Sequence, residues 1–260
     1  MSDADEPTPA PAPPSEDPPM EIHKPKPIHN WREFLSEIGV VVIGVCIALS
    51  AEQAVEALHN HSRAAEARAS VREEIARNLA NMNYREATEA CMTTRLDEVQ
   101  GLISDSAAGR LPPEAIWIGH PIAPAPVDGK YKIATQSGAA SLFDGKEQAI
   151  YAELYGQFAE YSQRLQEEER AWADLRALET HPLPSATLDW QLHSAMQQAR
   201  TGRYYINFLR QLALKEAADI GVTPAQREKL KMPPVCVPLH TQRDEAVRLS
   251  AEPGYNLPIP

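Results

Sequence analysis

An uncharged apolar run near the start of the chain extends from Ile38 to Ala51. A run of about 10–14 residues is more typical of a buried core helix or a signal-peptide core than of a membrane span. Extended to Trp31 and Val55, however, the segment exceeds the roughly 20 helical residues that cross a hydrocarbon layer of ~30 Å. The charged residues of this extension lie near its ends, where headgroups and water can reach them. We therefore predict a transmembrane helix over residues 31–55.

The flanks of this segment indicate how it is used. Trp31 and Arg32 suit the headgroup region, where they would act as interfacial anchors. One alternative is a cleaved signal peptide, since Ala48 and Ser50 are small residues ahead of a possible cut at Ala51. The other is a buried helix of a soluble protein. The segment before residue 31 is long, acidic and proline-rich, unlike the short basic start of a signal peptide, so the sequence favours an uncleaved signal anchor.

The orientation of the span follows from the charges beside it. Lys24, Lys26 and Arg32 precede the apolar run, whereas Glu52 and Glu56 follow it. Cytoplasmic flanks of spans carry an excess of Lys and Arg. We therefore expect the N-terminus in the cytoplasm and residues from about 56 onward on the opposite side of the membrane.

Beyond the span, apolar residues recur three and four positions apart, the spacing of one helix face. The pattern predicts helices over residues 52–103, 147–179 and 187–220, with a kink in the polar stretch 83–90. We expect an all-α protein whose N-terminal transmembrane helix continues into a long juxtamembrane helix, followed by an antiparallel helical bundle and a Pro-rich C-terminal arm. A self-associating coiled-coil stalk is the alternative for the first long helix, but its heptad spacing is not sustained.

Residues 104–137 interrupt the helical pattern with repeated Gly and Pro. Residues 116–118 and 131–133 are predicted to be two short strands or extended segments packed on helices. Long loops in compact domains are often functional, and a small-ligand pocket around Trp117, His120 and Tyr131 is the alternative here to an ordinary loop. His120 has no Cys or Asp nearby at metal-ligand spacing.

Local signals mark the ends of the later helices. Asp144 and Glu147 have capping-box spacing, in which the aspartate accepts an early backbone N–H and the glutamate reaches back. Gly221 is predicted to be a C-terminal cap, and Thr223–Pro224 to start a short helix. The aromatic stripe after residue 147 is predicted to be core rather than a ligand wall. Its members are Tyr151, Tyr155, Phe158, Tyr161 and Trp172.

Length and composition limit the size of the core and the classes of partner. With 260 residues and 43% hydrophobic residues the chain can bury a sizeable core, and its formal charge of −11 argues against nucleic acid as a partner. The predicted domains are a disordered Pro/acidic tail (1–30), the transmembrane helix (31–55), a helical soluble domain (56–232) with the irregular insert 104–137, and the Pro-rich arm (233–260), which includes a helical turn around residues 243–249.

Three cysteines fall in different regions. Cys46 lies inside the predicted span, whereas Cys91 and Cys236 both belong to the domain expected outside the cytoplasm, where disulfides persist. A Cys91–Cys236 bridge would pin the C-terminal arm to the first long helix and stabilise the fold by about 4–5 kcal/mol in the chain-entropy model. Free buried thiols are the alternative.

The span also has a candidate packing face. Gly44 and Ala48 form a small-xxx-small pair and Ala51 continues the same side, which would let another helix approach closely. The predicted partners are the lipid bilayer and, through this face, a membrane protein or a second copy of the chain. Small residues tolerated in a lone span are the alternative.

Catalytic signatures do not stand out. The sequence lacks the HExxH, CxxC, GxSxG, phosphate-loop and dinucleotide-binding motifs. His59 and His61, two apart on a helix, make a poor metal pair. We therefore expect no catalysis, cofactor or metal, and predict a membrane-anchored interaction or accessory subunit of a larger membrane complex. The alternative is a periplasmic ligand sensor or enzyme with a pocket near the 104–137 loop.

The segment WREFLSEIGVVVIGVCIAL is followed by a Glu-Gln pair, an Arg/Glu-rich helix, and GKYKIATQSGAASL with a Tyr-rich helix. Over about residues 31–180 this order resembles a group of uncharacterised bacterial single-span membrane proteins with an N-terminal WREFLxEIxxVVIGVxIAL-type helix and a helical soluble region. The resemblance implies a bacterial inner-membrane protein, and it transfers no functional residues.

Overall fold

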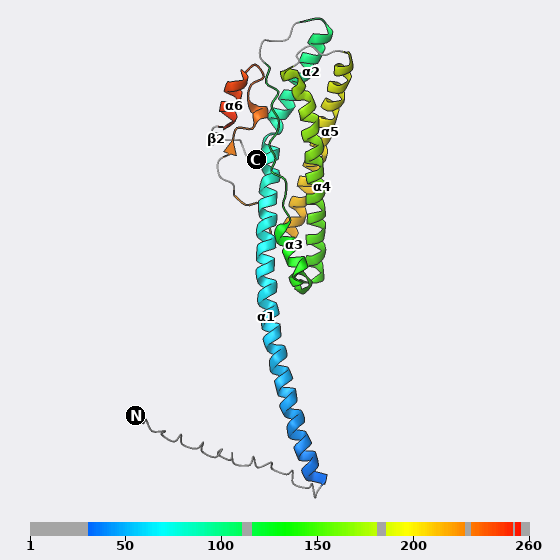
Figure 1. Cartoon of the computed structure of the whole chain (residues 1–260), viewed down its shortest axis with the longest axis vertical. Coiled ribbons are helices and arrows are strands. Elements are labelled where there is room, and N and C mark those ends of the chain that lie inside the picture. The colour runs from blue at the N-terminus through cyan, green and yellow to red at the C-terminus, as the bar shows by residue number, and fades with distance from the viewer. Residues whose placement is uncertain (1–30, 111–115, 181–185, 227–229, 252, 256–260) are drawn as a thin grey trace, which may run out of the picture. The chain divides into compact units, whose positions relative to one another are not determined.

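The computed structural model describes residues 31–110, 116–180, 186–226, 230–251 and 253–255 (Figure 1). The predicted N-terminal tail, residues 1–30, and the Pro-containing turn after residue 180 lie outside this part. The prediction of an all-α fold is confirmed. The elements are α1 (Trp31–Ala87), α2 (Glu89–Ala107), α3 (Gly129–Gln136), η1 (Ala139–Leu142), α4 (Gly145–Leu175), η2 (Arg176–Glu179), α5 (Ala186–Asp219), β1 (Leu230–Lys231), η3 (Pro234–Cys236), α6 (Arg243–Ala251) and β2 (Pro253–Tyr255), with β1 and β2 forming a short antiparallel pair.

The chain divides into two compact units, residues 1–55 and 56–260. The described part of the first unit is residues 31–55 of α1, whose apolar side chains are exposed, Val40 and Ile47 by 69% and 65%. An 18-residue window of this helix has a mean hydropathy of 2.3, and none of it is buried against the described chain. By its length and composition, the helix is therefore long and apolar enough to cross a membrane.

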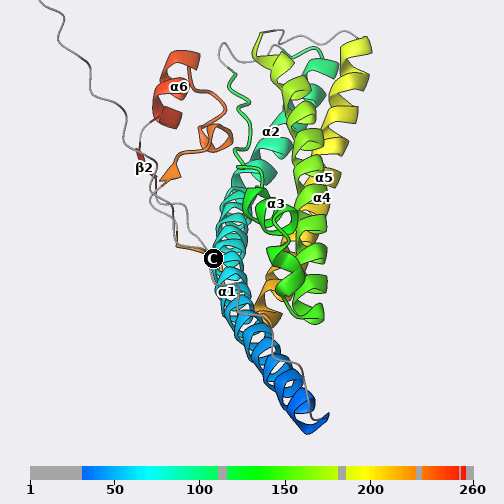
Figure 2. The same ribbon diagram turned by 60° about the horizontal axis from the view of Figure 1, so that its bottom comes forward.

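The second unit is a helical bundle with three legs. One leg is residues 56–87 of α1 followed by α2, and the other two are α4 and α5 (Figures 1 and 2). Arg68 pairs with Glu147, and Arg85 with Glu168, so α1 and α4 run in the same direction. Residues 116–128, ahead of α3, return along the bundle to make this possible (Figure 1). Helix α5 runs antiparallel to α4.

Two main clusters of apolar side chains form the core of the bundle. The first joins α1, α4 and α5, and the second joins α2 to the end of α4, the start of α5 and the C-terminal arm. The first leg is thus part of an intramolecular bundle. The aromatic stripe of α4 is confirmed as core, because the exposed fraction of each ring residue is small: Tyr151 0%, Tyr155 7%, Phe158 2%, Tyr161 1% and Trp172 1%.

The kink predicted in residues 83–90 is confirmed as a break at Thr88 between α1 and α2. The buried Thr88 hydroxyl donates to the carbonyl oxygen of Arg85 at 2.7 Å. Threonine hydroxyls offer the backbone such local bonds as an alternative to the helical ladder. Helix α2 then continues to Ala107, four residues beyond the predicted end at 103.

The helix caps follow the sequence in part. The Asp144 side chain accepts from Glu147 N at 2.9 Å, as predicted, but the reciprocal half of the capping box is wrong. The Glu147 carboxylate instead accepts from Arg68 Nε at 2.8 Å and from the Tyr151 hydroxyl at 2.7 Å. A charged partner on α1 gives a stronger bond than the exposed backbone N–H.

The end of α5 also follows the sequence in part. Gly221 has φ +67°, and Val222 N donates to Ala217 O at 2.9 Å, so the predicted C-terminal cap is confirmed. The short helix predicted from Thr223 is wrong over the described residues 223–226. Here Ala225 N donates to Ala76 O at 2.9 Å, a bond to α1 that takes this chain segment away from helical pairing.

The insert 104–137 contains a helix that the sequence did not predict. Residues 131–133 are helical, within α3, and the prediction of an extended segment there is wrong. The Glu74 carboxylate on α1 accepts from Lys130 N at 2.8 Å, Tyr131 N at 3.2 Å and the Tyr155 hydroxyl at 2.6 Å. A carboxylate from a distant helix therefore caps α3 and satisfies its free N–H groups.

The other predicted segment of the insert, residues 116–118, is extended and packed on helices, without forming a strand. Trp117 N donates to Leu239 O at 2.7 Å, and the Trp117 indole N–H donates to Pro234 O at 2.8 Å. Ile118 and Trp117 are both buried. This segment and the C-terminal arm thus pack against each other.

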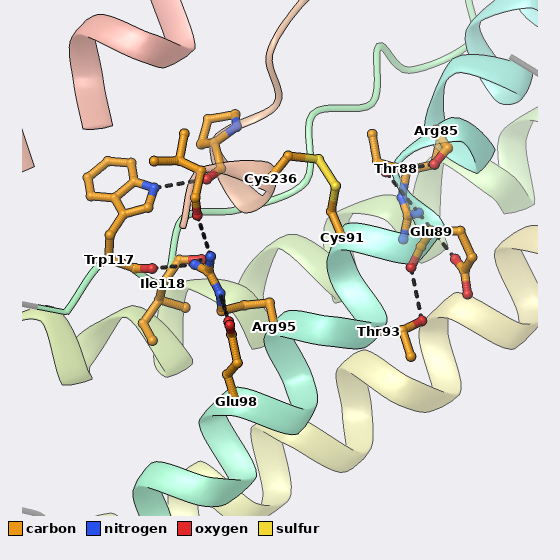
Figure 3. Close-up of a disulfide and its surroundings, with 12 residues drawn as sticks. Arg85, Thr88, Glu89, Cys91, Thr93, Arg95, Glu98, Trp117, Ile118 and Cys236 are labelled. Carbon is orange, nitrogen blue, oxygen red and sulfur yellow. Dashed lines mark hydrogen bonds and ion pairs between the residues drawn. A yellow bond between two sulfur atoms is a disulfide. The ribbon is translucent and has the colours of Figure 1, made fainter. Parts of the chain in front are cut away.

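A disulfide and an arginine hold this pair of segments on α2 (Figure 3). Cys91 and Cys236 are joined, with their Cα atoms 4.9 Å apart and a sequence separation of 145. One turn further along α2, the buried Arg95 guanidinium donates to the carbonyl oxygens of Trp117, Ile118 and Val237 and pairs with Glu98 at 2.7 Å. The predicted helical turn in the arm is confirmed as α6.

Gly119 is needed at the crossing of these two segments, and its replacement gives a first prediction. Gly119 has φ +65°, and a Cβ there would overlap the carbonyl oxygen of Pro234. We expect Gly119→Ala to lower the free energy of unfolding by about 3 kcal/mol or more, through backbone strain plus overlap. Gly138→Ala is the matched control, because Gly138 has φ +75° but open space around it; it should cost only about 1 kcal/mol. Denaturant unfolding of the detergent-solubilised protein measures both, and equal losses would contradict the predicted overlap.

Candidate interaction surface

Helix α5 has one face packed in the core and one face exposed on the surface of the bundle. Its buried face carries small and aliphatic residues at helical spacing, among them Leu192, Met196, Ile206 and Leu209. Tyr205 and Phe208 lie one position off this series and are 43% and 53% exposed. The small residues of α5 recur on one face of the helix. That face turns inward because only small side chains allow close packing on α4.

The outer face of α5 carries an open groove against α4. Arg164 and Glu167 come from α4, and the remaining lining residues come from α5. The groove has a volume of about 550 Å³ and is mostly apolar, within the range of small-molecule and peptide side-chain sites. Its α5 side consists of Trp190, His193, Ser194, Gln197, Gln198, Thr201, Gly202 and Tyr205.

The groove combines exposed aromatic rings with fixed charges. Trp190 is 73% exposed, and Tyr204, beside the groove, is 69% exposed. The Arg164 guanidinium lies 5.1 Å from the centre of the Tyr205 ring and donates to Glu167 at 2.9 Å. Trp, Tyr and Arg are the residue types that dominate binding energy at protein interfaces. The arrangement suits binding of another surface.

The predicted membrane packing residues lie on one side of α1 in the first unit. Gly44, Ala48 and Ala51 are spaced by four and three residues, and a Cβ at Gly44 would meet nothing within 4 Å. Trp31, at the first residue of α1, is 70% exposed, and its ring lies 5.6 Å from that of Phe34; Arg32 follows it in the same first turn.

Within the predicted span, the helix itself provides a partner for one polar side chain. The Ser50 hydroxyl donates to Cys46 O at 2.7 Å, one turn earlier on the same helix. Such a bond keeps this hydroxyl paired in a medium without water. The Cys46 thiol is free and exposed on the helix surface.

The pocket predicted around Trp117, His120 and Tyr131 does not form as predicted. Trp117 packs with Val237 in a small apolar cluster beneath α6. The Tyr131 ring stacks on the Tyr155 ring with centroids 4.2 Å apart, on α4. The sequence grouped these residues because one loop carries them, whereas the return of the chain along the bundle spreads them over its length.

His120 alone of the three lines a cavity, of about 210 Å³, with Leu165, Glu168 and Glu169 of α4 among its other walls. Its Nδ1 is buried and has no hydrogen-bond partner in the described protein. Burial, and next the positive charge of Arg176, lower the pKa of His120, so the imidazole is neutral at pH 7.

A buried ionic cluster is the feature that sequence reasoning missed. Arg85 and Glu168 are 1% and 3% exposed and form a two-point ion pair across α1 and α4. Glu89 lies 3.8 Å from Arg85 and pairs with Arg203 of α5 at 2.8 Å. Burial raises the pKa of Glu89, and the two arginines partly offset this rise. In sequence, an Arg among the Glu-rich helices gave no signal of burial.

Neither a search for metal-binding groups nor a comparison with known proteins identifies a further site. Among the described residues, no group of three His, Cys, Asp or Glu side chains could hold a metal ion. No family model, curated protein or solved structure matches the chain.

Proposed function

We propose that the protein is a membrane-anchored interaction or accessory subunit of a larger bacterial membrane complex. Residues 31–55 would hold it in the bilayer, and its helical domain would act through its surface rather than through catalysis. The apolar, uncovered helix near the N-terminus supports the anchor. The resemblance of the N-terminal segment to bacterial single-span proteins supports the inner membrane as its location.

The sidedness rests on charge. Lys24, Lys26 and Arg32 precede the span, whereas Glu52 and Glu56 follow it. Because cytoplasmic flanks carry an excess of Lys and Arg, this bias supports a cytoplasmic N-terminus and a periplasmic helical domain. The disulfide between Cys91 and Cys236 supports this assignment, because structural disulfides persist outside the reducing cytoplasm.

The observation that carries the interaction role is the α5 groove. A Trp and a Tyr, 73% and 43% exposed, lie beside an Arg that is already oriented by a carboxylate and a ring. The partner that fits is a protein segment with apolar side chains for the ring faces and a charged group for Arg164 or Glu167. Within the membrane, the face formed by Gly44, Ala48 and Ala51 would pack on a helix of the same partner or of a second copy.

The groove gives a second prediction. We expect Trp190→Ala to reduce co-purification of partner proteins from gently solubilised native membranes by about tenfold or more, the effect of an interface hot spot. Val247→Ala, a truncation at a side chain 52% exposed on α6, is the control and should leave co-purification unchanged. Recovery of the wild-type chain only as free monomer would contradict the proposed function.

A small-ligand sensor is the second candidate function. Two observations favour it: His120 lines a cavity of about 210 Å³, and its buried Nδ1 has no hydrogen-bond partner among the described residues. This function predicts that native mass spectrometry of the protein released from its membrane finds a bound small molecule that His120→Phe loses. An unliganded wild-type chain would argue against it.

A further inference from the structure

The end of the bundle formed by α3, η1 and the start of α4 lies beside the first residues of α1 in the helical unit (Figure 1). Arg63 Nη2 donates to Ser137 O at 2.9 Å, which fixes this end to α1. Arg63 is eight residues beyond Val55, and eight residues reach at most about 30 Å when extended, or about 12 Å along a helix. If the span ends near Val55, as proposed above, chain length alone keeps this end close to the lipid surface.

A cavity of about 270 Å³ opens at this end, between α1 and α3. Its charged lining residues are Arg63 and Lys130, with Glu66 as the one carboxylate, so cations outnumber anions at the opening. Ser70 and Ser137 add hydroxyl groups to the wall. Ile133 also lines the cavity, and its side chain is 63% exposed. Guanidinium and ammonium groups are the usual protein ligands of a phosphate.

The surface around the cavity differs from the rest of an acidic chain. The stretch from residue 129 to residue 146 holds Lys130, Lys132 and Lys146 but a single acid, Asp144, in a protein of net charge −11. Within the described chain, no carboxylate forms an ion pair with Lys130 or Lys146, whereas Lys132 pairs with Asp128 at 2.9 Å across an exposed turn. Leu142 is 39% exposed beside them. Lysines interspersed with exposed aliphatic side chains are typical of surfaces that lie in the headgroup region.

From these observations we infer that the α3–η1 end of the domain binds anionic phospholipid. The headgroup phosphate occupies the cavity at Arg63 and Lys130, and Ile133 and Leu142 enter the headgroup–acyl boundary. This inference rests on the proposed membrane anchor, and it adds a second contact with the bilayer that would orient the domain and its α5 groove for a partner in the same membrane.

Photocrosslinking of the full chain in lipid nanodiscs tests this inference. A photoreactive phenylalanine analogue is placed singly at Ile133, at Val42 in the span, or at Trp190 in the groove, and lipid adducts are quantified by mass spectrometry. In nanodiscs with anionic lipid, we expect adducts at Val42 and Ile133 and almost none at Trp190. In purely zwitterionic lipid, or with Lys130→Glu, the adduct yield at Ile133 should fall by at least about fivefold, because the attraction of a single lysine to an anionic surface already accounts for that factor. Lys215→Glu, an equal charge reversal at an exposed lysine on α5, should leave that yield unchanged.

The outcomes separate the inference from the anchor. Adducts at Val42 with a yield at Ile133 no higher than at Trp190 would overturn the inference and leave the anchor in place. An Ile133 yield that ignores both lipid charge and Lys130→Glu would overturn recognition of the phosphate. Absence of adducts at Val42 would overturn the anchor and the inference together.

Discussion

Replacing Arg85 by methionine is expected to lower the free energy of unfolding by about 3–5 kcal/mol, the cost of removing one partner of a buried ion pair. The Glu168 carboxylate, 3% exposed, would be left in the core without the guanidinium that now donates to both of its oxygens. Glu89 is close by, and it would also lose the Arg85 charge that stabilises its ionised form. Denaturant unfolding of the detergent-solubilised protein, followed by tryptophan fluorescence, measures the loss.

The double variant Arg85→Met/Glu168→Leu is the matched control for this prediction. It removes both charges and fills the site with apolar side chains, which is often neutral for stability. We expect it to regain most of the stability lost in Arg85→Met. A double variant as unstable as the single one would show that shape, rather than an unpaired buried charge, limits this site.

Loss of the disulfide is expected to have an effect of similar size. Cys236→Ala should lower the free energy of unfolding by about 4–5 kcal/mol. The bridge closes a very long loop and so reduces the conformational entropy of the unfolded chain. The two cysteines are 145 residues apart in sequence. Arg95 should still hold the arm on α2 through its bonds to the carbonyl oxygens of Ile118 and Val237, so the folded state is expected to persist with a lower denaturation midpoint.

Reducing agent and the third cysteine provide the controls. Dithiothreitol should lower the wild-type stability to that of Cys236→Ala and leave the variant itself unaffected. Cys46→Ser should behave as wild type with and without reductant, since Cys46 forms no disulfide. A wild-type denaturation curve that does not respond to reductant would contradict a stabilising bridge.

Local patterns along the chain predicted the features that depend on near neighbours. The uncharged run from Ile38 to Ala51 gave the exposed apolar helix, and the polar stretch before residue 90 gave the break at Thr88. The Asp144 cap was also readable, because its acceptor and its N–H donor are three residues apart. In each case the physical cause lies within one or two helical turns.

Features that depend on distant partners were not predictable in the same way. Helix α3 is capped by Glu74, 56 residues before Lys130, and no local signal marks it as a helix. The exposure of Tyr205 and Phe208 depends on which face of α5 packs on α4, a shift of a single residue in the hydrophobic pattern. The groove therefore results from packing between helices. From the sequence alone, the apolar residues of α5 would be predicted to lie in the core.

Alkaline carbonate extraction of membranes containing the full chain tests the membrane anchor most directly. We expect the protein to remain in the pellet with the lipid after ultracentrifugation and to be released only by detergent, because no part of the described chain covers the apolar residues around Val42. Release into the supernatant as a well-behaved monomer without detergent would contradict the anchor, and with it the sidedness, the lipid-binding end and the membrane partner.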